Sequence, residues 1–290
     1  MKDNTISSTA LTVLQGILYT SKREKFSHLV SDSMKDACVK VLSSTVDGKK
    51  RLKQLDSKLF TMAVPIIEKL MVPGLTLHYV LRKKYIEDYV RDAISRGFTQ
   101  VVNLGAGFDT LAYRLSSEFS NVNFIEIDHP ATQVHKKDVL MQKQINNLHL
   151  LSVDFAKQNL ENELKNFTCF DAQKDTIFIS EGVLMYLEEN SVRDLFNSLK
   201  NLTSSKMEFI FTFIEPDSEN RDSYGLLLGL YLKIKGEHLH WNIKKSELSK
   251  FVNSLGYSQK VIIDSDNFKE DYLPNIQATL HRGEVIAVAL

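Results

Sequence analysis

The stretch VVNLGAGFDT, residues 101–110, joins an apolar run to two glycines around one alanine and to an aspartate two residues after the second glycine. An apolar strand that ends in a glycine turn and continues as a helix presents backbone N–H groups at a sheet edge, because glycine allows a tight turn and a close approach. This order of elements is typical of α/β sheets that bind nucleotide-like ligands. The turn predicts a binding site without identifying its ligand.

Seven short apolar runs alternate with helix-length segments from residue 100 onward. The first five have apolar, β-branched centres, which predicts an α/β fold with a mostly parallel sheet covered by helices on both faces. The predicted strands cover residues 100–104, 121–128, 148–154, 175–181, 207–215, 258–264 and 283–290.

The region before residue 98 is predicted to be helical. Apolar residues recur at helical spacing in TALTVLQGILYTSK (9–22), in 27–42 and in 75–95. The polar stretch VDGKKRLKQLDSK (46–58) is interpreted as a connection, and MVPGL (71–75) as a break, because proline and glycine interrupt helices. We therefore expect a helical N-terminal cap on the substrate side, residues 1–97, and a sheet domain, residues 98–290.

The composition is that of a globular protein without a metal site. The longest apolar stretch, GLLLGLYL (225–232), is much shorter than the roughly 20 residues that cross a bilayer, and no cleavage site follows the N-terminal apolar run. Cys38 and Cys169 stand far apart without metal-ligand spacing. We expect a soluble protein of the reducing cytoplasm, with no bound metal and no membrane partner.

Charge is balanced over the chain but not along it. The 36 basic and 36 acidic side chains cancel, so nothing favours a nucleic-acid partner. Residues 1–97 hold 17 Lys and Arg against 10 Asp and Glu, an excess of 7 positive charges. Two interpretations stay open: ordinary solvated helix faces, or a basic cap that favours an anionic substrate.

Acidic residues follow the first four predicted strands. Asp109, Asp128, Asp154 and Glu181 stand at or just after the carboxyl ends of these strands. A single acid there is commonly a helix cap. Ligands of such sheets bind beyond the carboxyl ends of the strands, so four acids in succession favour a binding site.

Two nucleotide-like ligands compete for this arrangement. A nicotinamide dinucleotide needs a third glycine, but Thr110 occupies that position, and Asp109 would repel a pyrophosphate. S-adenosylmethionine has no phosphate and carries a cationic sulfonium and an ammonium group. The acids therefore favour S-adenosylmethionine.

With S-adenosylmethionine as the ligand, each part of the cofactor has a predicted contact. Asp128 accepts both ribose hydroxyls, and Asp154 with the backbone of Phe155 contacts the adenine edge. The turn residues Gly105, Ala106 and Gly107 lie against the amino-acid portion.

The segments VVNLGAGFDTLAYRL, FIEIDHP, SVDF and ISEGVLMYL resemble, in order and spacing, the leucine carboxyl methyltransferase family, which includes bacterial O-methyltransferases of the polyketide type. The resemblance implies a class I methyltransferase fold, Rossmann-like, with strand order 3-2-1-4-5-7-6 and the last strand antiparallel. It also implies that Arg82, in LRKKYIEDYV, binds the cofactor carboxylate. The family's remaining cofactor positions fall on Gly105, Asp128, Asp154 with Phe155, and Glu181.

Some positions depart from the family or carry no assignment. Many bacterial members have an arginine where this chain has Leu111. Tyr186 and Tyr224 are candidates for the acceptor pocket. His240 and Trp241 are interpreted as lid packing, and His129 as a turn residue.

We expect an S-adenosylmethionine-dependent O-methyltransferase that esterifies a carboxylate of a small molecule or of a chain end. A carboxylate, with a pKa near 4, is ionised at neutral pH and needs no general base, so positioning suffices and no catalytic residue is named. Two alternatives stay open from the sequence: a binding module that holds the cofactor without turnover, and a dinucleotide-dependent oxidoreductase.

Overall fold

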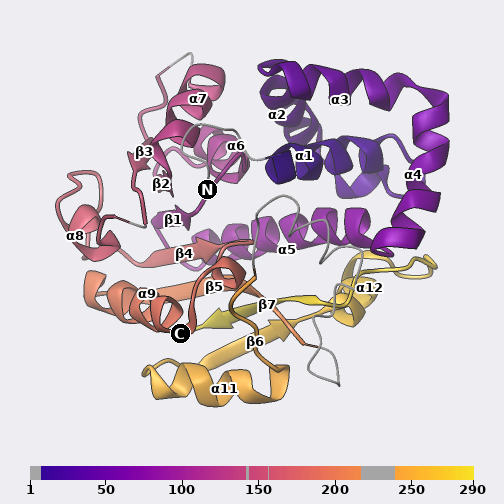
Figure 1. Cartoon of the computed structure of the whole chain (residues 1–290). Coiled ribbons are helices and arrows are strands. Elements are labelled where there is room, and N and C mark those ends of the chain that lie inside the picture. The colour runs from indigo at the N-terminus through magenta and orange to yellow at the C-terminus, as the bar shows by residue number, and fades with distance from the viewer. Residues whose placement is uncertain (1–7, 142–143, 156, 217–238) are drawn as a thin grey trace.

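The computed structural model describes residues 8–141, 144–155, 157–216 and 239–290 (Figure 1). Its centre is one seven-stranded sheet in the order β3-β2-β1-β4-β5-β7-β6. All neighbouring pairs are parallel except those of β7, which runs antiparallel to both β5 and β6. The strands are β1 (Gln100–Leu104), β2 (Asn123–Asp128), β3 (Leu148–Ser152), β4 (Thr176–Ser180), β5 (Met207–Ile214), β6 (Gln259–Ile263) and β7 (Glu284–Ala289).

The predicted fold class and strand order are confirmed. Each predicted strand contains the observed one, with ends that are longer by at most two residues. Strand β1 pairs with β2 on one side and with β4 on the other, so the chain reverses its direction of winding between β1 and β4. In doubly wound sheets this switch point is where ligands bind.

Helices cover both faces of the sheet. One hydrophobic cluster contains Leu115 and Phe268, and the other, on the opposite face, contains Phe196 and Leu248. These pairs come from α6 and α12, and from α9 and α11, respectively. The elements that follow β1 are α6 (Leu111–Glu118), α7 (Pro130–Leu140), α8 (Leu160–Lys165), η2 (Leu184–Tyr186), α9 (Glu189–Leu202), α11 (Lys245–Ser254) and α12 (Ser265–Tyr272).

The N-terminal region is helical as predicted, but one segment is corrected. Residues 46–58, expected to be a polar connection, form α3 almost entirely. The Thr45 side chain caps this helix by accepting a hydrogen bond from the N–H of Gly48 (2.8 Å). Of the apolar side chains of this helix, only Leu52 and Leu55 pack inward, and two residues are too few to show a helical spacing in the sequence. The lysines and the glutamine of the segment do favour a helix. The N-terminal elements are α1 (Ser8–Ser21), η1 (Ser27–Leu29), α2 (Asp32–Ser43), α3 (Val46–Asp56), α4 (Lys58–Met71) and α5 (Leu75–Ser95).

The predicted helix over 27–42 is interrupted, and the predicted break at 71–75 is present. Ser31 caps α2 by accepting from the N–H of Met34 (3.2 Å), so η1 and α2 are separate elements. Gly74 adopts a left-handed φ of 78° between α4 and α5. A Cβ atom there would lie 2.5 Å from the carbonyl oxygen of Thr279, so only glycine fits this turn.

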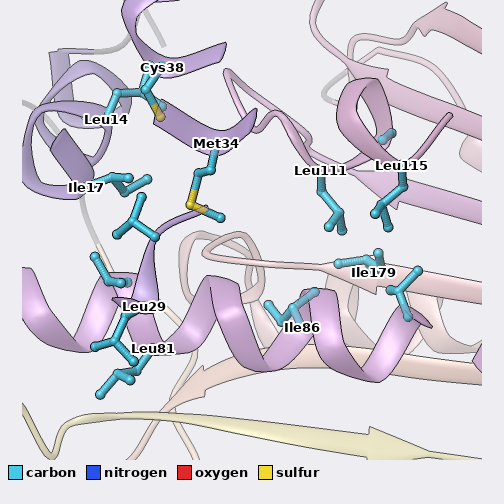
Figure 2. Close-up of a cluster of buried hydrophobic side chains, with 14 of the residues drawn as sticks. Leu14, Ile17, Leu29, Met34, Cys38, Leu81, Ile86, Leu111, Leu115 and Ile179 are labelled. Carbon is cyan, nitrogen blue, oxygen red and sulfur yellow. The ribbon is translucent and has the colours of Figure 1, made fainter. Parts of the chain in front are cut away.

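Helix α5 lies between the other N-terminal helices and the sheet. Figure 2 shows Leu81 and Ile86 of α5 in one cluster with Met34 of α2 and Ile179 of β4. The core is therefore continuous across this region, and a boundary between two parts at residue 98 stays a prediction.

No single helix among the described residues is long and apolar enough to cross a membrane. Helices α4 and α5 pass a test of length and composition only when taken together, with a bend of 90° between them.

Candidate functional site

The glycine turn follows β1 and lies beside η2. Gly105 and Gly107 have φ values of 65° and 48°, in the left-handed region that glycine tolerates. A Cβ atom on Gly105 would approach Cγ2 of Val183 to 2.5 Å, so a side chain has no room there. The N–H of Ala106 donates to the carbonyl oxygen of Ile127 (3.1 Å), which ties the turn to β2.

Asp109 ends the turn and is used within the protein. Its Oδ1 accepts from the N–H groups of Thr110 (2.6 Å) and Leu111 (3.2 Å) at the start of α6, and it lies 3.3 Å from Nζ of Lys83. Burial alone would raise the pKa of Asp109, but Lys83, Lys136 and nearby charges hold it at about 2. Asp109 is therefore ionised and accepts the two N–H groups at the start of α6, and it is a negative charge near the turn.

Asp128 is held in place by two backbone groups. Its Oδ2 accepts from the N–H of Gly107 (2.7 Å), and its Oδ1 accepts from the N–H of His129 (2.7 Å). Each carboxylate oxygen has a further acceptor position, because two bonds leave about two of the four lone-pair sites free. A rigid carboxylate therefore stands at the end of β2, beside the glycine turn.

Asp154 and Phe155 follow β3. Asp154 lies 3.0 Å from Nζ of Lys157 and 3.9 Å from Nε2 of His129. The Phe155 side chain is exposed, at 41%. His129 caps α7 through Nδ1, which accepts from the N–H of Ala131 (3.3 Å), and this agrees with its interpretation as a turn residue.

Arg82 and Glu181 meet at the carboxyl end of β4. The Arg82 guanidinium contacts Glu181 at 2.7 Å and Glu284 at 2.5 Å, and Lys83 reaches Glu181 at 3.1 Å. All four side chains are nearly buried. Burial lowers the pKa of Arg82, but the two carboxylates outweigh it and raise that pKa. Glu284 has a lowered pKa because Arg82 and His78 outweigh the opposing effect of burial.

Sequence reasoning missed Lys83, Glu284 and His78. Lys83 stands next to Arg82 in the sequence, so the pair of adjacent basic residues could have indicated a second cation at the site. Glu284 begins β7, and only the insertion of that strand between β5 and β6 brings it to α5. Nε2 of the buried His78 lies 3.3 Å from Oε2 of Glu284, and the ring of His281 contacts the ring of His78 edge-on.

The charges of this cluster complement the predicted cofactor. Asp109, Glu181 and Glu284 supply three negative charges, and Arg82 and Lys83 supply two positive ones. The buried excess is one negative charge. S-adenosylmethionine carries a sulfonium, an ammonium and a carboxylate, a net charge of plus one, so the residues present fit it. A dinucleotide pyrophosphate would add negative charge to this excess.

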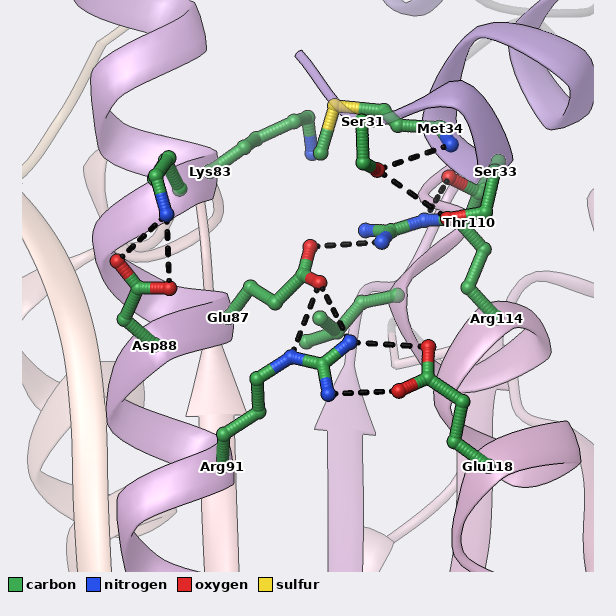
Figure 3. A network of polar contacts seen from close by, with 12 residues as sticks. Ser31, Ser33, Met34, Lys83, Glu87, Asp88, Arg91, Thr110, Arg114 and Glu118 are labelled. Atoms are coloured by element: carbon green, nitrogen blue, oxygen red, sulfur yellow. Dashed lines mark hydrogen bonds and ion pairs between the residues drawn. The ribbon is translucent and has the colours of Figure 1, made fainter. Parts of the chain in front are cut away.

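A second ionic network fastens α5 to α6 (Figure 3). Arg114 of α6 pairs with Glu87 of α5 at 2.7 Å, and its Nε donates to the hydroxyl of Thr110 (3.2 Å). Arg91 bridges Glu87 and Glu118. Because Thr110 directly follows Asp109, this network supports the helix start that closes the glycine turn.

The acceptor candidates are only partly placed. Tyr186, in η2, is half-buried and packs beside Met185 and Ile214, while Tyr224 lies outside the described residues. His240 pairs with Glu188 at 2.9 Å. Trp241 is buried against Phe251.

Leu111 and Cys38 pack in the main hydrophobic cluster, and Cys169 is half-buried. Leu111, where many bacterial members have an arginine, is buried in the core. Both cysteines are free thiols, and burial raises the pKa of Cys38 to about 12. The part of the chain that the structure describes contains no group of three or more His, Cys, Asp or Glu side chains that could hold a metal ion.

The family model described as leucine carboxyl methyltransferase matches residues 18–200. The chain belongs to this family. The match takes in Arg82, the glycine turn and the four strand ends, so it covers the described cluster apart from Glu284. The four acidic residues at the strand ends therefore all lie within the part of the chain that matches the family.

Similar proteins agree with this membership. The chain is 31% identical over 201 residues to a probable leucine carboxyl methyltransferase 1 of Caenorhabditis briggsae, a match covering 60% of this chain and 59% of that protein. It is 24% identical over 277 residues to a putative S-adenosyl-L-methionine-dependent methyltransferase of Mycobacterium avium, covering 91% and 87%. A solved structure of a putative methyltransferase from Thermobifida fusca shares the fold, with a TM-score of 0.57 at 16% identity, covering 87% and 93%.

The protein is therefore an S-adenosylmethionine-dependent methyltransferase. The family replaces the dinucleotide-dependent oxidoreductase that the sequence left open. A methyltransferase also requires a methyl acceptor.

Proposed function

We propose that this enzyme transfers the methyl group to a carboxylate of a small molecule or of a chain end and forms a methyl ester. The observation that supports this proposal is that the titratable side chains that the structure describes at the strand ends include no residue placed to act as a general base. They are acids and cations in ion pairs. The described histidines nearby are engaged in other contacts: His129 caps α7, His78 is buried against Glu284, and His240 pairs with Glu188. A carboxylate acceptor needs no base, whereas a phenol or alcohol does.

The cofactor roles proposed for the site follow its geometry. Asp128, fixed by two N–H groups, accepts the ribose hydroxyls, and Asp154 with Phe155 contacts the adenine. Glu181 receives the ammonium group and Arg82 the carboxylate, because these two charges already face one another in a nearly buried place. Gly105, Ala106 and Gly107 line the amino-acid portion.

The chain's own contribution to catalysis is positioning. The bound cofactor supplies a methyl group made electrophilic by its sulfonium. Glu284 pairs with Arg82, and His78 contacts Glu284, so both support the position of Arg82. Arg82 would in turn fix the carboxylate end of the cofactor. Correct placement of two reactants lowers a barrier by on the order of 7 to 11 kcal/mol, so no further group is required. The helices of residues 1–97 would cover the acceptor side of the site. We also propose that the enzyme acts in the cytoplasm.

The test is a methyl-transfer assay with paired acceptors. A peptide that ends in leucine with a free carboxylate is compared with the same peptide amidated, beside a panel of small carboxylic acids and phenols. The proposal expects labelled methyl only in free carboxylates and its release by mild alkali, since esters hydrolyse and ethers do not. An alkali-stable product from a phenol would overturn the carboxylate assignment and leave the cofactor site untouched.

A further inference from the structure

Helix α4 carries apolar side chains on two sides, of which one faces the protein. On that inner side Phe60 and Val64 pack against the main hydrophobic cluster. The Glu68 carboxylate accepts a hydrogen bond from the N–H of Thr76 at the start of α5 (2.8 Å). These contacts account for the position of α4 but not for its other side.

The outer side is an apolar stripe of Leu59, Met62, Ile66 and Leu70. Their spacing of three, four and four residues places them in one row along the helix. They are 82%, 73%, 64% and 69% exposed, and none of the 14 residues of α4 is buried. In Figure 1 the helix lies at the right-hand edge of the molecule. A helix that is apolar on both sides normally has both sides covered.

Exposed lysines lie along one flank of this stripe and on the preceding helix. At 100° per residue, Lys58 and Lys69 stand directly beside it on α4. The preceding helix, α3, presents the 76% exposed Val46 on its outer side. The same side of α3 carries three exposed lysines, Lys49, Lys50 and Lys53. None of these five lysines forms an ion pair with another residue that the structure describes.

This pattern suits an anionic lipid surface better than a second copy of the chain. Two copies related by a twofold axis would bring the same lysines together, and like charges repel. A single protruding helix also offers less than the roughly 800 Å² per partner that a stable protein interface buries. A helix lying on a bilayer inserts its apolar row at the acyl boundary while its lysines extend to the phosphates.

We propose that the stripe of α4, with the lysines of α3 and α4, docks the enzyme on an anionic membrane surface. This proposal departs from the expectation from the sequence that the protein has no membrane partner. The helix lies on the surface and does not span it, because the adjoining α5 buries nine residues in the core. Residues 1–97 have an excess of positive charge, and the proposal gives a role to the lysines of α3 and α4, which take no part in the cofactor site. It does not depend on the acceptor being a carboxylate.

The experiment is sedimentation of the full chain with vesicles of phosphatidylcholine, alone or mixed with phosphatidylglycerol. We expect binding to the mixed vesicles only, weakened by salt. The double variant Ile66→Ser with Leu70→Ser should bind at least about tenfold more weakly, since every inserted methylene contributes. Replacing Lys49 and Lys50 by glutamine should weaken binding by roughly fivefold per lysine.

Matched controls separate docking from folding. Val134→Ser removes an apolar side chain that is 61% exposed on α7, and Lys206→Gln removes an exposed lysine before β5. Both controls should bind vesicles as the unaltered protein does, and all variants should keep its melting temperature and its affinity for S-adenosylhomocysteine. Equal binding by the stripe variants, absence of binding to mixed vesicles, or self-association that the stripe variants abolish would each overturn the proposal.

Discussion

At the scale of single residues, two carboxylates with similar hydrogen bonds are expected to have different functions. Asp128 and Asp264 both stand at strand ends and accept backbone N–H groups. Asp264 caps α12 and pairs with Lys245, far along the sheet from the glycine turn. The two residues therefore have similar local roles and different expected functions.

We expect Asp128→Ala to lose measurable affinity for S-adenosylhomocysteine in calorimetry. Charge-assisted hydrogen bonds to two ribose hydroxyls contribute about 1.5 to 3 kcal/mol each, so their joint loss exceeds a hundredfold in affinity. Asp264→Ala is the control: it should lower the melting temperature through loss of a cap and leave the affinity unchanged. Equal affinities of Asp128→Ala and the unaltered protein would remove Asp128 from the site.

At the scale of elements, the position of α6 depends on a buried ion pair. The Arg114 and Glu87 side chains are 3% and 11% exposed. Without Arg114, the nearly buried Glu87 keeps only Arg91, which is 34% exposed, as an ionic partner. The pair joins α6, which begins at the glycine turn, to α5, which carries Arg82. Stability and the alignment of the site are therefore coupled through these two helices.

Arg114→Ala should lower the free energy of unfolding by at most about 3 to 5 kcal/mol, the usual effect of breaking a buried pair, because Arg91 still contacts Glu87. Arg193 pairs with Glu189 on the surface of α9, with side chains that are 37% and 59% exposed. Arg193→Ala should cost less than about 1 kcal/mol in the same urea titration, because water screens that pair. Similar losses in the two variants would mean that the α5 to α6 pair contributes no more than a surface pair.

At the scale of the whole molecule, acid sensitivity should come partly from His281. Burial and the neighbouring His78 lower its pKa to about 4, against an ordinary value of 6.5, although Glu284 acts in the opposite direction. As the pH falls below 6.5 the unfolded chain takes up this proton first, so stability falls between about pH 6.5 and 4. The loss approaches about 3 kcal/mol below that range, and it is absent above pH 7.

The measurement is the slope of the unfolding free energy against pH between about 4.5 and 6.5. This window lies between the lowered pKa of His281 and its ordinary value. His281→Gln should flatten the slope by about one proton even if the variant is less stable overall. His28→Gln, at an exposed position, should leave the slope as it is in the unaltered protein. An unchanged slope in His281→Gln would show that another group binds the proton.

The predictable part of the fold lies in segments whose local pattern and tertiary role agree. The seven strands are recognised because their central residues are apolar and β-branched, which is what a sheet covered on both faces requires. Helix α3 was not recognised, because it packs through few side chains and its lysines face outward. The interruption at Ser31 was missed for a related reason, since a single capping serine decides it.

The sequence by itself determined the sheet, the glycine turn and the acids at the strand ends, because each depends on residues that are neighbours in the chain. Only the tertiary structure decided what surrounds Arg82. Glu284 is distant in the sequence, and it reaches α5 because β7 enters the sheet between β5 and β6. The exposed stripe of α4 is also a tertiary fact. Two apolar rows on one helix look alike in the sequence, and packing alone determines which row is covered.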